Sequence, residues 1–101
     1  MLRISREVHN ERLVLNVEGS LRGPWVDELE RVWEMDFDRA EQMCVNLADV
    51  SYVDDAGKSL LGRMFKHGTE LTASGPYMQV VVKEITRGAA RSGHRHQTIA
   101  R

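Results

Sequence analysis

The stretch "VNLADVSYVDDAG", residues 45–57, carries most of the information about the fold. An apolar strand runs directly into two adjacent carboxylates, Asp54 and Asp55, which are followed by an alanine and a glycine. Aspartate is a strong N-cap because its carboxylate accepts a free backbone N–H at the start of a helix. One aspartate therefore predicts that the strand turns into a helix after Val53, and Gly57 allows a close backbone approach. The second aspartate is explained only in part, by the positive end of the helix dipole.

Two neighbouring carboxylates could also work as an acid–base pair if their pKa values were split. That chemistry needs a cleft and convergent partners. Adjacent residues of an extended segment point in opposite directions, however, and no histidine lies nearby in the sequence. A phosphate cradle fits poorly as well, because a P-loop is glycine-rich and basic whereas this loop has one glycine and two negative charges. The sequence therefore predicts no catalytic residue and no enzyme.

The first part of the chain alternates between apolar and polar residues over 2–8 and 12–18, which predicts a β-hairpin with a short turn at "HNE". The period then changes in "GPWVDELERVWEMDF", residues 23–37, where apolar residues recur at helical spacing. Pro24 suits the first helical position. Both Trp25 and Trp33 belong to this stripe, so we expect them to pack in the core rather than to form a ligand platform.

The second part of the chain predicts a short interior strand over 43–47, a helix over 57–68 and a short strand over 70–74. Gly68 can provide the left-handed cap of that helix, and Gly62 inside it indicates close packing. The segment 77–85 contains three consecutive valines, which favour a strand by propensity. Its apolar residues nevertheless follow the helical i, i+3, i+4, i+7 spacing after a proline, and we predict a helix.

The predicted order is β-β-α-β-α-β-α. Strand–helix–strand units imply right-handed crossovers and parallel pairing, and the opening hairpin adds an antiparallel edge. We therefore expect an α/β domain over 1–86, with a mixed sheet of about four strands and helices packed mainly on one face. From residue 87 the pattern disappears in a segment with four arginines and no acidic residue, which predicts a flexible basic tail over 87–101.

Composition excludes several classes of function. The chain has 101 residues and a formal net charge of −1, so its overall charge favours neither nucleic acid nor a membrane surface. Cys44 is the one cysteine and lies in an apolar run, where we expect a packed thiol. No run approaches the roughly 20 apolar residues of a membrane span, and we expect a cytoplasmic protein. The four histidines lack structural-zinc spacing, and although His94 and His96 could bind a stray divalent ion, we expect neither a metal site nor a cofactor.

The segment "VNLADVSYVDDAGKSLLGRMFKHG" resembles the signature of STAS domains, the family of anti-sigma-factor antagonists. That signature is an apolar strand followed by aspartate-serine-serine/threonine-glycine at the start of a helix. The positions that match are Asn46, Leu47, Asp49, Val50, Tyr52, Val53, Asp54 and Gly57, together with "LLGR" in the helix. "LVLNVEGSL" is similar to the family's second strand and turn, and the resemblance covers roughly residues 2–86. The family's usual glycine-leucine turn near the end is not evident after Gly88.

The resemblance implies a non-enzymatic module that binds a protein partner. Antagonists of this family bind an anti-sigma factor that is also a kinase, and phosphorylation of the first serine after the aspartate breaks the complex. Asp55 stands at that serine position here, Ala56 at the second hydroxyl position and Lys58 where leucine is usual. An aspartate cannot accept this phosphate, and its charge of about −1 is smaller than the −1.5 to −2 of phosphoserine. We expect Asp54, Asp55, Ala56, Gly57 and Lys58 to form the partner-binding surface, without phosphorylation at Asp55.

Two other functions remain open within this resemblance. The STAS subunit of a lipid-transport ABC system can also carry a "D-x-A-G" motif and would bind the transporter ATPase. A scaffold role, in which the domain self-associates as a homo-oligomer, is the other. The residues do not distinguish among these partners.

Overall fold

The structure is a computed structural model that describes the backbone of residues 2–37 and 42–100 and the side chains of 2–36 and 42–88. It confirms the predicted β-β-α-β-α-β-α order. The elements are β1 (Leu2–His9), β2 (Arg12–Leu21), α1 (Pro24–Phe37), β3 (Gln42–Val53), α2 (Asp55–Lys66), β4 (Glu70–Thr72) and α3 (Pro76–Ala100).

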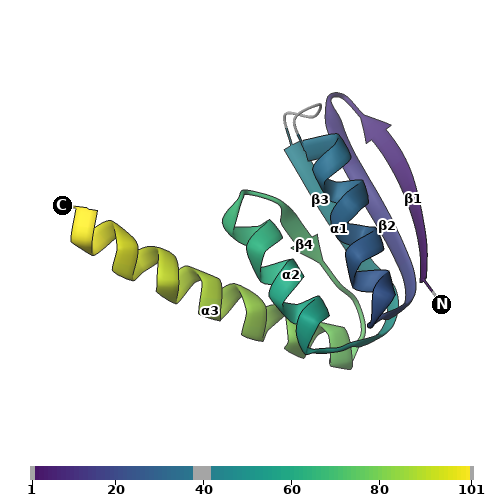
Figure 1. Ribbon diagram of the computed structural model, residues 1–101. Helices are drawn as coiled ribbons and strands as arrows, with labels where there is room; N and C mark the ends of the chain where they lie inside the picture. Colours follow the sequence, from purple (N-terminus) through teal and green to yellow (C-terminus); the bar gives the residue numbers. More distant parts are fainter. Residues whose placement is uncertain (1, 38–41, 101) are drawn as a thin grey trace.

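The four strands form one mixed sheet in the order β1-β2-β3-β4. β1 pairs with β2 antiparallel, whereas β2–β3 and β3–β4 are parallel, as the crossovers predict. Asn10 and Glu11 form the hairpin turn, and both have positive φ angles, 51° and 69°. This is the two-residue geometry that matches the twist of the flanking strands. Figure 1 shows the helices on one side of the sheet and β1 at its outer edge.

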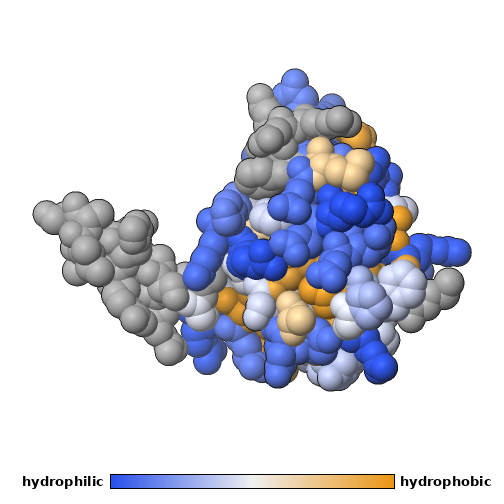
Figure 2. Space-filling view, viewed as in Figure 1, coloured by the Kyte–Doolittle hydropathy of each residue, from blue (hydrophilic) through white to orange (hydrophobic). Residues whose placement is uncertain are grey.

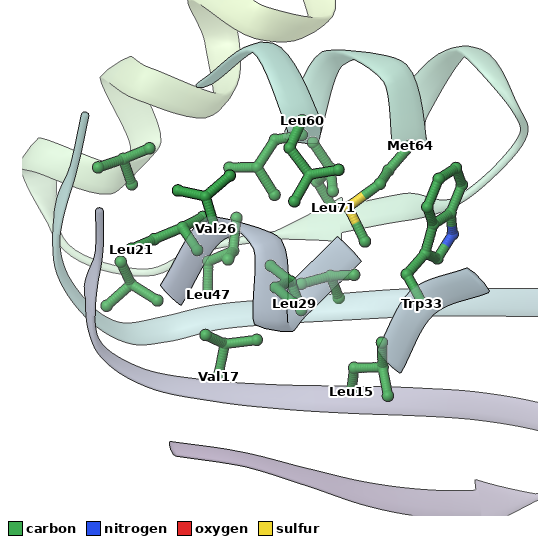
Figure 3. Close-up of a cluster of buried hydrophobic side chains, with 14 of the residues drawn as sticks. Leu15, Val17, Leu21, Val26, Leu29, Trp33, Leu47, Leu60, Met64 and Leu71 are labelled. Atoms are coloured by element: carbon green, nitrogen blue, oxygen red, sulfur yellow. The ribbon is translucent and has the colours of Figure 1, made fainter. Parts of the chain in front are cut away.

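The core fills the space between the sheet and the helices (Figure 3). Each element contributes its apolar face, and the labelled residues are Leu15, Val17, Leu21, Val26, Leu29, Trp33, Leu47, Leu60, Met64 and Leu71. Most of these side chains are fully buried, and burying a leucine contributes about 1.5–3 kcal/mol. The same cluster includes Met78, Val81 and Ile85 of α3, which confirms the helical reading of the valine-rich segment.

The two tryptophans of α1 do not share one environment, so the prediction that both lie in the core was wrong for Trp25. Trp33 is buried, and its indole Nε1–H donates to the hydroxyl of buried Thr69 at 3.0 Å. Trp25 is exposed at 37%. Leu29 lies about 40° from each tryptophan around the helix, but the buried Val26 extends the core-facing side beyond Trp33, so Trp25 lies at the edge of the buried face.

Two further elements differ in detail from the prediction. β3 is longer than the predicted 43–47, because its pairing with β2 continues to Val53 past two irregularities in register. Gly62 was predicted to mark close packing, but a Cβ built there would meet only Ile85 Cγ2 at 3.9 Å, an ordinary contact. The helix α3 continues through Ala100. A flexible tail over 87–101 and the domain limit at residue 86 both stay predictions.

Candidate functional site

Asp54 joins two loops at the start of α2. It is the N-cap of the helix, and its Oδ1 accepts the backbone N–H of Gly57 at 2.7 Å. Its Oδ2 accepts the backbone N–H of Gly23 at 3.0 Å, from the loop between β2 and α1. Its own N–H donates to the carbonyl of Leu21 at 3.1 Å. Asp54 therefore holds the first turn of α2 against the end of β2, which is the cap that the sequence predicted plus a tertiary contact.

These bonds favour the ionised form of Asp54. The N–H groups of Gly23 and Gly57 lower the pKa of the Asp54 carboxyl below its ordinary value, and the nearby charge of Arg22 lowers it further. A general base for work near neutral pH needs a pKa close to that pH. Asp54 is shifted in the opposite direction, and both of its oxygens already accept hydrogen bonds. The geometry is that of a structural carboxylate.

Gly57 lies in the third position of α2 and is buried against the end of β2 and β3. A Cβ at this position would lie 2.8 Å from Val53 Cγ1 and 2.9 Å from the carbonyl oxygen of Leu21. Carbon atoms normally approach to about 3.5–4.0 Å. Only glycine fits here without movement of a neighbour, so the close approach predicted from the sequence is present.

Asp55 is the first residue of α2, and its side chain is exposed. Within the described part of the chain it makes no hydrogen bond or ion pair, so its carboxylate faces solvent beside the positive end of the helix. Ala56 is exposed next to it. The two adjacent aspartates thus have different environments: Asp54 is turned toward the protein and Asp55 toward the outside.

Lys58 is half-buried and does not pair with the aspartates, since among the described residues no ion pair joins it to Asp54 or Asp55. It instead lines a groove of about 360 Å³ between α2 and α3, whose lining also includes Lys66 and Glu84. The five predicted residues therefore lie together at the start of α2. They are not equivalent, because Asp55 and Ala56 are presented to solvent while Asp54 and Gly57 hold the turn.

Sequence reasoning missed three residues that surround this turn. Gly23 and Leu21 bind Asp54 through their backbone groups, and the hydroxyl of Tyr77 accepts the N–H of Val53 at 3.3 Å. The "GP" pair at residues 23–24 signals a turn, but not which segment lies beside it. Tyr52 and Tyr77 are both nearly half exposed near this end of the molecule. Figure 2 shows the helix-bearing face as mostly hydrophilic, with hydrophobic patches between the helices.

The remaining candidate features lie elsewhere. Cys44 is buried as a free thiol, as predicted. No group of three or more metal-ligating side chains comes together among the residues with described side chains. His94 and His96 fall outside those residues. In the described part of the chain no helix is long and apolar enough to cross a membrane.

Comparison with known proteins identifies the fold. No family model matches the sequence, and no curated protein matches it. Among solved structures, the chain is similar to an anti-sigma factor antagonist from Mycobacterium paratuberculosis, with a TM-score of 0.73 and 17% identity over 87% of this chain and 82% of that one. It is also similar to the anti-sigma factor antagonist SpoIIAA in its unphosphorylated form, with a TM-score of 0.62 and 24% identity over 80% and 82%.

A third similar structure is the STAS domain of an antisigma-factor antagonist from Rhodobacter sphaeroides, with a TM-score of 0.57 and 17% identity over 73% of this chain and 86% of that one. These likenesses show a STAS-like fold, as the sequence signature around residues 45–68 predicted.

Proposed function

We propose that the chain is a non-enzymatic, cytoplasmic protein-interaction module that binds an anti-sigma factor or a kinase-like regulator in a partner-switching pathway. The STAS-like fold and its likeness to three anti-sigma-factor antagonists support this proposal. The observation that carries it is the position of Asp55, an exposed carboxylate at the first position of α2, directly after the cap. This is the position at which the family resemblance places the phospho-acceptor serine.

The partner-binding surface in this proposal consists of Asp54, Asp55, Ala56, Gly57 and Lys58. Asp54 and Gly57 fix the first turn of α2, because one caps it and the other permits its close contact with β2. Asp55 and Ala56 offer solvent-facing groups to a partner. An anion at this place is favoured by the free N–H groups of the helix start.

Asp55 gives this surface a fixed negative charge. A serine would let a kinase switch the charge at this place from 0 to about −1.5 or −2, whereas aspartate holds it at about −1. We infer that the surface is not phosphorylated at residue 55 and remains in one charge state. Removal of that charge should therefore strengthen binding to a partner that prefers the uncharged, serine-bearing surface.

The test compares wild type, Asp55→Ser and the matched control Asp27→Ser. Asp27 is an exposed aspartate in the first turn of α1, so the control makes the same chemical change at another helix start. The probe is a purified anti-sigma kinase from the source organism, and its affinity is measured by isothermal titration. We expect Asp55→Ser to bind at least tenfold more tightly than wild type, a difference of about 1.4 kcal/mol, and Asp27→Ser to bind as wild type does.

A second measurement tests the acceptor position. With ATP and the same kinase, intact mass should increase by one phosphate only in Asp55→Ser. Equal affinities of wild type and Asp55→Ser would exclude the fixed-charge idea. If neither protein binds an anti-sigma kinase but both retain a transporter ATPase from membrane extracts, the lipid-transport function replaces the proposal.

A further inference from the structure

β1 is the edge strand of the sheet, and α1 reaches it through the ion pair between Arg6 Nε and the buried Asp36 Oδ2 at 2.8 Å. Among the strands that the structure describes, the sheet order places β1 outside β2 with no strand on its other side (Figure 1). The helices contact the other strands, since α1 packs on β2, α2 on β3 and β4, and α3 on β3. An edge of eight residues presents a row of unpaired N–H and C=O groups, which can pair with another strand.

The side of β1 that faces the helix layer is only partly buried. Leu2 is buried, but the side chains become more exposed along the strand, and Val8 is exposed at 70%. A groove of about 520 Å³ lies between this strand and α1, lined by Leu2, Ile4, Arg6, Trp25, Glu28 and Val32. The exposed Trp25, which does not pack in the core, forms part of the wall of this groove. The apolar layer of the domain thus ends in an open groove along β1.

The sequence of β1 is complementary to itself in one antiparallel register. Residues directly opposite each other in such a pair lie on the same face of the sheet. If two copies pair with Ser5 opposite Ser5, Arg3 lies opposite Glu7, and Leu2 lies opposite Val8. Each of these pairs occurs twice because the arrangement is two-fold symmetric.

In this register, the residues that lie opposite each other point to the same side of the joined sheet. Leu2 and Val8 both pair with apolar or glycine positions of β2 on the helix-bearing side, at Gly19 and Leu13. Arg3 and Glu7 both lie on the opposite, open side of the sheet. Their side chains are exposed at 80% and 54%, so both are accessible to a second copy, although within the chain Arg3 pairs with Glu18 at 4.0 Å and Glu7 accepts from Asn16.

The neighbouring registers that keep the faces aligned are less favourable. A pair centred on Arg6 would place the two Arg6 side chains opposite each other, and like charges directly opposite destabilise a sheet. A pair centred on Ile4 would place Leu2 opposite Arg6 and leave Glu7 without an opposite residue in β1. The register centred on Ser5 also sets Ile4 opposite Arg6, whose guanidinium is already paired with Asp36 of α1 at 2.8 Å. Of the three registers, it is the one that places Arg3 opposite Glu7 and Leu2 opposite Val8.

We propose that the chain forms a two-fold symmetric dimer through antiparallel β1–β1 pairing centred on Ser5. The pairing joins two four-stranded sheets into one continuous sheet and brings the two open grooves side by side. This surface is separate from the start of α2, so the dimer leaves the proposed partner-binding surface free.

The first test is charge reversal on the full chain, followed by sedimentation velocity from about 1 µM to about 1 mM. Arg3→Glu and Glu7→Arg each replace two opposite-charge pairs with two like-charge pairs. Each should raise the dimer dissociation constant about tenfold or more. An equimolar mixture of the two variants should dimerise again, because each copy then meets its opposite charge in the other. Lys83→Glu and Glu84→Arg, on exposed positions of α3, are the matched controls and should behave as wild type.

The second test reads the register. In an antiparallel pair, directly opposite Cα atoms lie about 4.5–5.5 Å apart, within the roughly 4.4–6.8 Å that a disulfide spans. Ser5→Cys should therefore form a covalent dimer under mild oxidation. Arg3→Cys should not, because two copies of residue 3 would be about 13 Å apart along the strands. The native Cys44 is buried and serves as the background control in wild type.

Recovery of the dimer in the mixture, together with crosslinking through Ser5→Cys alone, would support the proposal. A monomer at every concentration would overturn it. A dimer that is unaffected by both charge reversals, or that crosslinks equally through Arg3→Cys, would overturn the proposed register and the surface. Thermal melts of each variant, followed by tryptophan fluorescence, identify any variant that is unfolded, and the Ser5→Cys result remains decisive in that case.

Discussion

Replacement of Gly57 by alanine tests whether the start of α2 depends on close packing against the sheet. The new methyl group would lie 2.8 Å from Val53 Cγ1 and 2.9 Å from the carbonyl oxygen of Leu21. The valine side chain can rotate, but the carbonyl belongs to the backbone of β2 and already accepts the N–H of Asp54 at 3.1 Å. Relief of the overlap therefore requires α2 to shift or that hydrogen bond to weaken.

The expected size of the effect follows from two opposing terms. Overpacking of a tight site costs about 1–3 kcal/mol, and weakening of one hydrogen bond adds about 1 kcal/mol. Alanine offsets up to about 1 kcal/mol through its higher helix propensity. We expect Gly57→Ala to lower the free energy of unfolding by about 1–3 kcal/mol, which corresponds to a decrease in Tm of about 4–8 °C for each kcal/mol.

The matched control is Gly62→Ala in the same helix. There the new Cβ would meet only Ile85 Cγ2 at 3.9 Å. The helix-propensity gain is then unopposed, and we expect Gly62→Ala to stabilise the protein by about 0.5–1 kcal/mol. Urea unfolding followed by far-ultraviolet circular dichroism measures both changes. If Gly57→Ala were as stable as Gly62→Ala, the argument that close approach at residue 57 requires glycine would be refuted.

Three further substitutions test other contacts. Asp54→Asn should destabilise the protein at neutral pH. Because the pKa of Asp54 is lowered in the folded state, the stabilising effect of its carboxylate is present above about pH 4 and is lost as the pH falls through the folded pKa. Urea titrations at several pH values should therefore show the stabilities of the two proteins converging in acid. Trp33→Phe removes the indole donor to the buried Thr69 hydroxyl and should cost about 1–3 kcal/mol, so an unchanged urea midpoint would contradict the role of this bond. Glu11→Gly relieves about 1 kcal/mol of left-handed strain, and the entropy that the unfolded chain gains offsets this effect only in part. We expect Tm to rise by a few degrees, and a decrease in Tm would contradict this reasoning.

Much of the candidate site could be predicted from local sequence. The strand-to-helix turn at residues 53–55, the capping aspartate and the close approach at Gly57 are all present. The turn and the cap were predictable because capping acts within a few residues of the chain. The glycine indicated a close approach, but its partner, the carbonyl of Leu21, is supplied by the fold. The helical identity of the valine-rich segment was predictable for a related reason, since its apolar period extends over several turns and outweighs residue propensity.

Other properties of the site depend on contacts between distant segments. The second hydrogen bond of Asp54 comes from Gly23, 31 residues earlier in the chain, and it distinguishes this aspartate from its neighbour. Periodicity likewise assigned Trp25 and Trp33 to one stripe, but the width of the helix face that the sheet covers decided that Trp25 stays exposed. Lys58 faces the groove beside α3 rather than the aspartates because α3 packs against α2.

The sequence by itself determined the order of the elements, the position of the turn into α2 and the charge that this turn presents, because hydrogen-bond capping, backbone freedom and side-chain period are local properties. Only the tertiary structure decided which of the two aspartates is held by the fold and which tryptophan is buried. Those features depend on which segments the sheet order brings side by side, and the strength of a contact between segments about 30 residues apart is not encoded in either segment alone.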